Sequence, residues 1–256
     1  MFHVKQNSYE VIVLGGGHAG VEAAVAASRI GAKTALITFN LSDLGAMSCN
    51  PAMGGLGKGH IIREIDALGG VMGVASDSAG IQFRMLNRTK GEAVRGPRAQ
   101  IDRNLYKKNI KRILRKEKIR IIEGEVIDVR LHRNKKKIKS IELLTGTRLY
   151  CNSFVVTSGT FLNGMIHCGK ERYSAGRYGA KSSKKLSNFF KSQNFLMRRL
   201  KTGTPPRLIS STIDFKKCLE QKGDENPVPF SFLTKEINIK QLPCYITKSS
   251  EKGHKL

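Results

Sequence analysis

The period of apolar residues changes along the chain, and the N-terminal stretch has the clearest pattern. Residues 11–14 form an apolar run followed by glycines, which is typical of a buried parallel strand. Val21, Ala24, Val25 and Ser28 then recur at helical spacing, and Gly31 ends that segment. Residues 34–38 form a second strand-like run. The pattern predicts a βαβ unit of about 30 residues.

Weaker patterns continue downstream. Apolar spacing predicts helices over residues 60–68 and 98–118, the second with a stripe made of Tyr106, Ile110, Ile113 and Leu114. Short apolar runs predict strands at residues 119–122, 126–131, 138–144 and 154–157, of which the middle two flank a charged turn. No period is visible over residues 41–59 and 80–100, which we expect to be irregular. The order of these elements indicates an α/β fold with a parallel sheet and a β-meander.

The glycines after the first strand point to a ligand. Gly15, Gly17 and Gly20 form GxGxxG between the strand and the helix. At this place the glycines permit a tight turn and let backbone N–H groups approach a pyrophosphate. The acidic residue that usually contacts a ribose is missing, and Phe39 and Asn40 stand in its place.

Composition adds a question about partners. The chain has 256 residues and a formal net charge of +25, from 45 Lys and Arg against 20 Asp and Glu. Such an excess favours a polyanionic partner, but lysine enrichment from a biased genome accounts for it equally well. The five cysteines are scattered and have no metal-ligand spacing, so we expect free thiols. No apolar run is long enough for a transmembrane helix, and the N-terminus does not resemble a signal peptide.

A second glycine-rich stretch, "MSCNPAMGGLGKGH" at residues 47–60, is not a Walker loop, because Gly59 and not Ser or Thr follows its lysine. It belongs to a series of blocks in fixed order: GGGHAG (15–20), EIDALGG (64–70), GIQFRMLN (80–87), RAQIDR (98–103), SGTFLNG (158–164) and LKTGTPPR (200–207). With these blocks the chain resembles the N-terminal part of the tRNA uridine 5-carboxymethylaminomethyl modification enzymes, the MnmG or GidA family.

The resemblance implies a fold and an activity. The fold is an FAD-binding, Rossmann-like sheet of the glutathione-reductase type, with part of an inserted α+β domain. The activity uses FAD, with NADH and methylenetetrahydrofolate as co-substrates, to modify C5 of the wobble uridine (position 34) in certain tRNAs. It implies a homodimer that works with an MnmE-type GTPase, without a membrane, in the cytoplasm or, in a eukaryote, in mitochondria.

Site residues follow from the matching blocks. The resemblance assigns the FAD pyrophosphate loop to Gly15, Gly16, Gly17, His18, Ala19 and Gly20. It further assigns FAD contacts to Val126, near the adenine, and to Ser183. Around Ser183 the chain reads YSAGRYGAKSS, without the two prolines and the acid of the family pattern.

Cys49 is the candidate catalytic residue, since it matches the cysteine of the family's MSCNPAxGG block. A thiolate there is suited to attack uridine C6, while the alternative role is that of a small buried apolar residue. Further cations are candidates for contacting tRNA phosphates or the folate glutamate tail: Arg95, Arg98, Arg103, Lys201 and Arg207. Glu92 replaces a proline of the family pattern in the same region.

Family members are considerably longer than this chain. We therefore expect residues 1–162 to be the N-terminal part of the FAD-binding domain and residues 163–256 the start of the inserted domain on the substrate and NADH side. Two alternatives stay open: a non-catalytic remnant that binds FAD or RNA, and another folate- and FAD-dependent oxidoreductase that modifies tRNA uracil. The 47–60 block argues against the second alternative.

Overall fold

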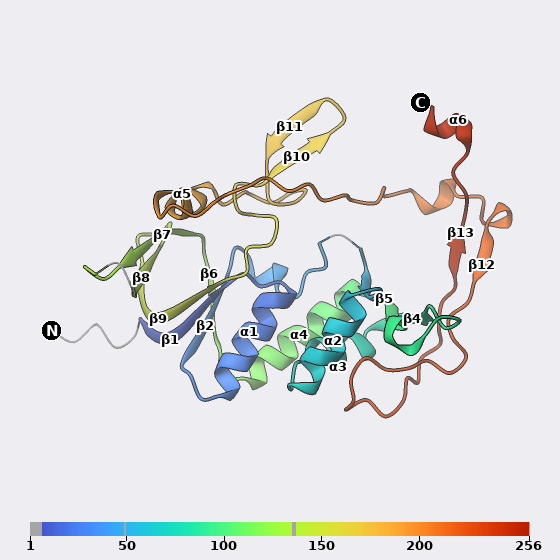
Figure 1. The fold of residues 1–256 in the computed structure, drawn as a ribbon, viewed down its shortest axis with the longest axis horizontal. Helices are drawn as coiled ribbons and strands as arrows, with labels where there is room; N and C mark the ends of the chain where they lie inside the picture. The colour runs from blue at the N-terminus through green and yellow to red at the C-terminus, as the bar shows by residue number, and fades with distance from the viewer. Residues whose placement is uncertain (1–6, 49, 135–136, 256) are drawn as a thin grey trace. The chain divides into compact units, whose positions relative to one another are not determined.

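A computed structural model of the chain describes residues 7–48, 50–134 and 137–255 (Figure 1). It divides into two compact units, each made of two segments of chain. Unit 1 comprises Met1–Ser48 and Lys107–Thr202, and unit 2 comprises Cys49–Tyr106 and Gly203–Leu256. The units are described separately below.

Unit 1 is built on a six-stranded sheet of order β6-β2-β1-β9-β8-β7. Strands β6, β2, β1 and β9 run parallel, and β8 and β7 continue as an antiparallel meander. The strands are β1 (Ser8–Leu14), β2 (Thr34–Thr38), β6 (Arg120–Glu123), β7 (Val126–Leu131), β8 (Ile138–Leu143) and β9 (Arg148–Val156). The expected α/β fold with a parallel sheet and a meander is confirmed.

The β1–α1–β2 unit forms as the periodicity predicts. Helix α1 (His18–Arg29) crosses between β1 and β2, and Val11 pairs with Thr34 in parallel register. The buried face of α1 consists of small or short residues, namely Gly20, Val21, Ala24, Val25 and Ala27. All five residues of β2 are buried, as expected for a strand covered on both faces.

Other elements of unit 1 surround this sheet. They are η1 (Leu41–Asp43), the hairpin of β10 (Met165–Cys168) and β11 (Glu171–Ser174), α5 (Lys184–Ser192) and most of α4 (Arg103–Lys116). The core joins residues of β1, β2 and the meander to Leu186 of α5, which is fully buried.

Helix α4 is shorter than the predicted 98–118 helix. Arg98 and the three residues after it belong to strand β5, and Asp102 separates strand from helix. The Asp102 carboxylate accepts the N–H groups of Asn104 and Leu105 at 2.8 and 2.9 Å, so the helix begins at an aspartate cap. The predicted stripe is confirmed for Tyr106, Ile110 and Leu114, which are at most 1% exposed.

Unit 2 contains a three-stranded antiparallel sheet of order β3-β5-β4 and a separate two-stranded pair. The first sheet consists of β3 (Ala52–Gly54), β5 (Gly96–Ile101) and β4 (Gly80–Leu86), and the second of β12 (Leu219–Gln221) and β13 (Cys244–Ile246). The helices are α2 (Lys58–Ala67), α3 (Met72–Asp77), α6 (Glu251–His254) and the short η2 (Glu92–Val94), η3 (Ser210–Thr212) and η4 (Phe215–Lys217). The predicted helix at 60–68 is therefore confirmed as α2.

The expectation that residues 80–100 are irregular is wrong, as it is for part of residues 41–59. On one face of the β4–β5 pair, Phe83 and Ala99 are 2% and 1% exposed, while the neighbouring positions of both strands carry glutamine and arginine. Arginine and glutamine on the second face hide this alternation from a search for apolar runs. Short β3 pairs with β5 and carries only one large side chain, Met53.

Candidate functional site

The 15–20 loop connects β1 to α1 in unit 1 and is held in a single shape by close contacts. Gly15 has φ +115°, and a Cβ there would overlap the carbonyl oxygen of Thr157. Thr157 follows β9 and donates its hydroxyl to Leu14 O at 2.7 Å. A Cβ on Gly20 would overlap Gly15 O. Only glycine at both positions permits this turn.

Gly17 differs from its neighbours because it faces open space. It is the N-cap of α1, with φ −78° and ψ −171°, and no atom lies within 4 Å of a Cβ built on it. The first N–H groups of a helix have no partner within the helix and carry a partial positive charge. No acidic residue occupies the first turn of α1. The loop therefore presents backbone donors to an anion on the side where Gly17 leaves room.

The structure places the other predicted members of this loop around that opening. Gly16 is buried against Thr38 and Leu44, and its carbonyl accepts the N–H of Gly45 at 2.9 Å. His18 is half-buried and Ala19 is exposed. The sequence patterns did not identify Thr157 as a residue that contacts the loop. The SGT motif at residues 158–160, directly after Thr157, was the signal that a strand ends there.

A polar network lies at the end of β2, where a ribose-binding acid usually stands. Asn40 is exposed, and its side chain donates to Asp43 at 3.4 Å. Asp43 also forms an ion pair with Arg177. Glu123, at the end of neighbouring β6, accepts the N–H of Leu41 at 2.8 Å. Two carboxylates thus lie close to the end of β2, although both already have partners.

The two remaining predicted FAD contacts are buried in unit 1. Val126 opens β7, is 1% exposed, and packs in the same core cluster as Ile12 of β1. Ser183 is the N-cap of α5, is 4% exposed, and donates its N–H to Phe161 O at 2.8 Å. Leu186, one turn into α5, belongs to that core cluster too. The side chain of Val126 thus packs in the core, so we expect any cofactor contact from this position to come from its main chain.

Cys49 lies outside the described residues, but the structure shows the rest of its block. The stretch contains β3 and ends in the first turn of α2, with Gly54, Gly55 and Gly57 all at positive φ. A Cβ on Gly59 would lie 2.7 Å from Pro97 O, so α2 packs directly on β5. The block is therefore an ordered strand-turn-helix connection in its described part.

The predicted cations occupy different surroundings. Arg95 pairs with Glu92 at 3.2 Å. Burial and the nearby positive charge of Arg207 lower the pKa of Arg103, so these two cations lie close together in unit 2. Lys201 is exposed in unit 1. Arg98 lies on β5 beside Arg84 of β4, a pair that sequence reasoning missed because it treated β4 as irregular.

The described residues form neither a metal-binding cluster nor a membrane-spanning helix. No group of three or more His, Cys, Asp or Glu side chains is arranged to hold a metal ion in this part of the chain. Within the same residues, no helix combines the length and apolarity needed to cross a bilayer.

The parallel β1–α1–β2 unit, with its glycine loop at a helix N-terminus, defines an α/β protein with a Rossmann-type fold. Residues 10–256 match the family model described as GIDA, glucose inhibited division protein A. The chain belongs to this GidA family.

Similar proteins agree with this assignment. The chain is 49% identical over 252 residues to "tRNA uridine 5-carboxymethylaminomethyl modification enzyme MnmG" of Thermodesulfovibrio yellowstonii, covering 98% of this chain and 40% of the relative. The enzyme of the same name from Campylobacter fetus is 49% identical over 249 residues, with 97% and 40% covered. The chain thus spans about two fifths of the length of these relatives.

Solved structures show the same fold. GidA of Aquifex aeolicus superposes with a TM-score of 0.88 at 43% identity, over 93% of this chain and 41% of the Aquifex chain. A GidA-related protein from Thermus thermophilus superposes with a TM-score of 0.53 at 16% identity, over 73% of this chain and 69% of that chain. The second likeness concerns the fold alone.

Proposed function

We infer that this chain forms the FAD-binding part of a tRNA-modifying enzyme that adds a carboxymethylaminomethyl group at C5 of the wobble uridine. The observation that carries this proposal is the 15–20 loop, which is open at Gly17 and lies at the N-terminus of α1. Its support comes from chains of the same family whose names state a 5-carboxymethylaminomethyl modification of tRNA uridine. NADH and methylenetetrahydrofolate are the proposed co-substrates.

The residues of the loop fit the pyrophosphate of FAD. A side chain at position 17 would fill the space where a phosphate has to approach the N–H groups of α1. Gly15, Gly16 and Gly20 lie in close contact with Thr157, Thr38 and Leu44, and these contacts fix the shape of the loop that binds the pyrophosphate. FAD, when bound, supplies the redox chemistry, and the chain supplies position and charge.

The wider assembly belongs to the same proposal. We place residues 1–162 in the FAD-binding domain and residues 163–256 in an inserted domain on the substrate side. Val126 is proposed to contribute to the FAD site through its main chain, and Ser183 is proposed as a further FAD contact. The proposed partners are tRNA, an MnmE-type GTPase and a second copy of the enzyme, all in the cytoplasm.

The first test replaces Gly17 with valine. Its backbone conformation is allowed for any L-residue, and a side chain meets no atom, so Gly17→Val is expected to fold normally and to lose bound flavin. The measurement is the visible flavin absorption of the purified chain, before and after incubation with FAD and desalting. Gly91→Val is the matched control, because Gly91 also has open space and φ −60° but lies outside the loop. Equal flavin content in Gly17→Val and Gly91→Val contradicts the assigned loop.

The second test concerns Cys49 as the proposed catalytic thiol. Cys49→Ser, introduced into the enzyme at the length of its curated relatives, is expected to retain flavin and to lose tRNA modification, because a hydroxyl is a far weaker nucleophile than a thiolate. Modified uridine is measured by mass spectrometry of digested tRNA. Cys168→Ser, at an exposed thiol of the β10–β11 hairpin, is the control. Full modification by Cys49→Ser assigns Cys49 a structural role.

A further inference from the structure

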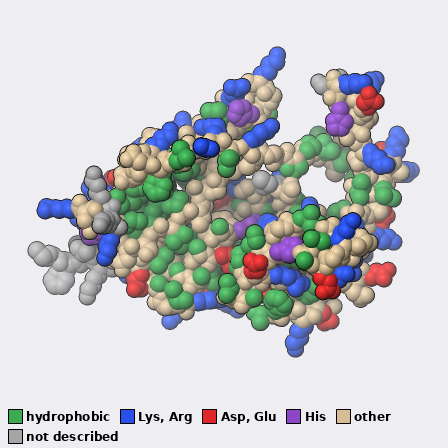
Figure 2. All heavy atoms as spheres, viewed as in Figure 1, with side chains coloured by type: hydrophobic (Ala, Val, Ile, Leu, Met, Phe, Trp, Pro, Cys, Tyr) green, Lys and Arg blue, Asp and Glu red, His purple; other side chains and the backbone are tan. Residues whose placement is uncertain are grey.

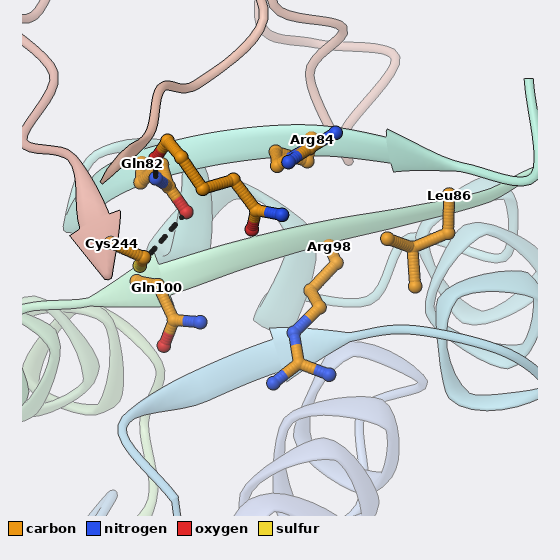
Figure 3. A pocket seen from close by; sticks show the side chains of 7 residues that line it. Gln82, Arg84, Leu86, Arg98, Gln100 and Cys244 are labelled. Atoms are coloured by element: carbon orange, nitrogen blue, oxygen red, sulfur yellow. Dashed lines mark hydrogen bonds between the residues drawn. The ribbon is translucent and has the colours of Figure 1, made fainter. Parts of the chain in front are cut away.

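One face of the β4–β5 ladder in unit 2 is not used for the core. Side chains alternate between the two faces of a strand, and Phe83 and Ala99 occupy the core face. On the opposite face Arg84 is paired with Arg98, and Gln82 is adjacent to Gln100 in the same register. This face borders a pocket of about 210 Å³ (Figure 3).

The side wall of this pocket is fixed by hydrogen bonds. Gln82 donates its amide to the carbonyl of Gln221 at 2.8 Å. The thiol of Cys244 donates to Gln82 Oε1 at 3.1 Å, and Cys244 pairs with Gln221 in the β12–β13 ladder. Figure 3 shows this bond at one end of the pocket and Leu86 at the other. These bonds attach the β12–β13 pair to β4, and the pair closes one side of the pocket.

The two arginines in the pocket have no anionic partner within the described part of the chain. Neither Arg84 nor Arg98 forms an ion pair there, and Arg84 Nε is buried without a hydrogen-bond partner. By contrast, Arg88 just beyond β4 pairs with Asp224 at 2.8 Å. Like charges placed opposite each other on neighbouring strands destabilise a sheet. An anion in the pocket would give the arginines that line it a partner and satisfy the buried donor.

We propose that this pocket, which Arg84 and Arg98 both line, binds an oxyanion, the phosphate or carboxylate group of an anionic ligand. The planar guanidinium fork matches both oxyanions with two parallel hydrogen bonds. The amide of Gln100, which has no hydrogen bond to another described residue, is a further donor at the same face. Leu86 provides an apolar surface for the part of the ligand next to its charge.

Size and position limit what enters. Pockets for whole drug-sized ligands have volumes of about 300–1,000 Å³, so 210 Å³ suits a charged head group or a small anion. All lining residues belong to unit 2, whereas the proposed FAD loop belongs to unit 1. The substitutions that test the oxyanion site therefore differ from those that test the FAD loop, and either proposal can fail alone.

The test compares two double variants of the 256-residue chain that remove equal charge. Arg84→Gln with Arg98→Gln empties the pocket of cations, while Lys90→Gln with Lys235→Gln removes two exposed cations of unit 2 outside the pocket. Calorimetric titration with inorganic phosphate, glutarate and a 12-mer of oligouridylate at low salt gives the affinity for each oxyanion source. We expect at least one probe to bind about tenfold more weakly to the arginine variant and with unchanged affinity to the lysine variant.

The probe whose affinity falls in the arginine variant identifies the source of the oxyanion. A loss for phosphate indicates a free phosphate group, and a loss for glutarate indicates a carboxylate. A loss for oligouridylate alone indicates a phosphodiester chain. Thermal unfolding without ligand is a second measurement, in which the arginine variant should melt no lower than the wild type, because repulsion has been removed. Arg98→Gln alone is titrated in parallel and gives the same comparison with a single substitution. Equal losses in the arginine and lysine variants, or no binding of any probe to the wild type, overturn the proposal.

Discussion

Cys151 and Cys168 are both free thiols of unit 1, and their surroundings separate their chemistry. Cys151 lies in the core cluster beside Leu149 and Leu143, and burial raises the pKa of its thiol to about 11. Cys168 ends the β10 strand and is exposed. Since the thiolate is the reactive form, Cys151 is both inaccessible and protonated at neutral pH.

This difference predicts a labelling pattern. With N-ethylmaleimide at neutral pH, Cys168 is expected to react at least about 100-fold faster than Cys151. Peptide mass spectrometry at timed intervals measures both rates, and unfolding in guanidinium should bring them together. Similar rates in the folded chain would mean that the β8–β9 region opens frequently.

Within the elements of unit 2, two carboxylates at helix ends hold a distant segment of chain. Asp77, the last residue of α3, accepts the N–H groups of Phe230 and Ser231 at 2.7 and 2.9 Å. Asp66 of α2 accepts the N–H of Phe232 at 2.8 Å. Arg63 donates to Pro229 O at 2.8 Å. The 229–232 segment is thereby placed so that the fully buried Phe230 packs against Gly54.

Asp77 also makes the stability of unit 2 depend on pH. Burial raises the pKa of Asp77 above 3.8 and outweighs the opposing effect of its two backbone hydrogen bonds. The folded chain therefore holds the proton more tightly than the unfolded chain. The stability contributed by Asp77 increases as pH falls through the raised pKa, and it decreases again as pH rises through it.

Asp77→Asn tests this element. An amide presents N–H₂ to one of the two backbone donors, so the substitution is expected to lower the free energy of unfolding by about 1–3 kcal/mol. Because asparagine does not titrate, the difference from the wild type should grow as pH is lowered from neutrality. Urea unfolding across that range measures it, with Asp128→Asn of β7 as control, a partly exposed carboxyl in unit 1. A difference that shrinks on acidification would show that the pKa of Asp77 is lowered, not raised.

At the scale of the whole molecule, the sequence predicts those structural features that are determined by residues close together in the chain. Apolar runs and GxGxxG define β1–α1–β2 because period and turn chemistry are both local. A search for apolar runs does not predict the pairing of β4 with β5, because one face of the pair is polar and borders a pocket. The attachment of Phe230 to Asp77 spans 153 residues, and no local pattern encodes it. In the candidate site the glycines can be predicted from the sequence. Thr157, which contacts the loop, cannot, because its contact depends on the pairing of β9 with β1.

The net charge is likewise a property of the whole chain, and the structure distributes it. Figure 2 shows Lys and Arg side chains spread over elements of both units on the face drawn, with fewer acidic ones among them. Where a cation has a specific partner, as Arg29 has in Glu117 at 2.7 Å, its role is local.

The 153-residue separation between Asp77 and Phe230 also has a consequence for biosynthesis. Helices α2 and α3 leave the ribosome long before the segment that completes their core. At usual translation rates the interval is roughly 8 to 30 seconds. During that time the residues that pack against Phe230, Gly54 among them, are uncovered on the nascent chain.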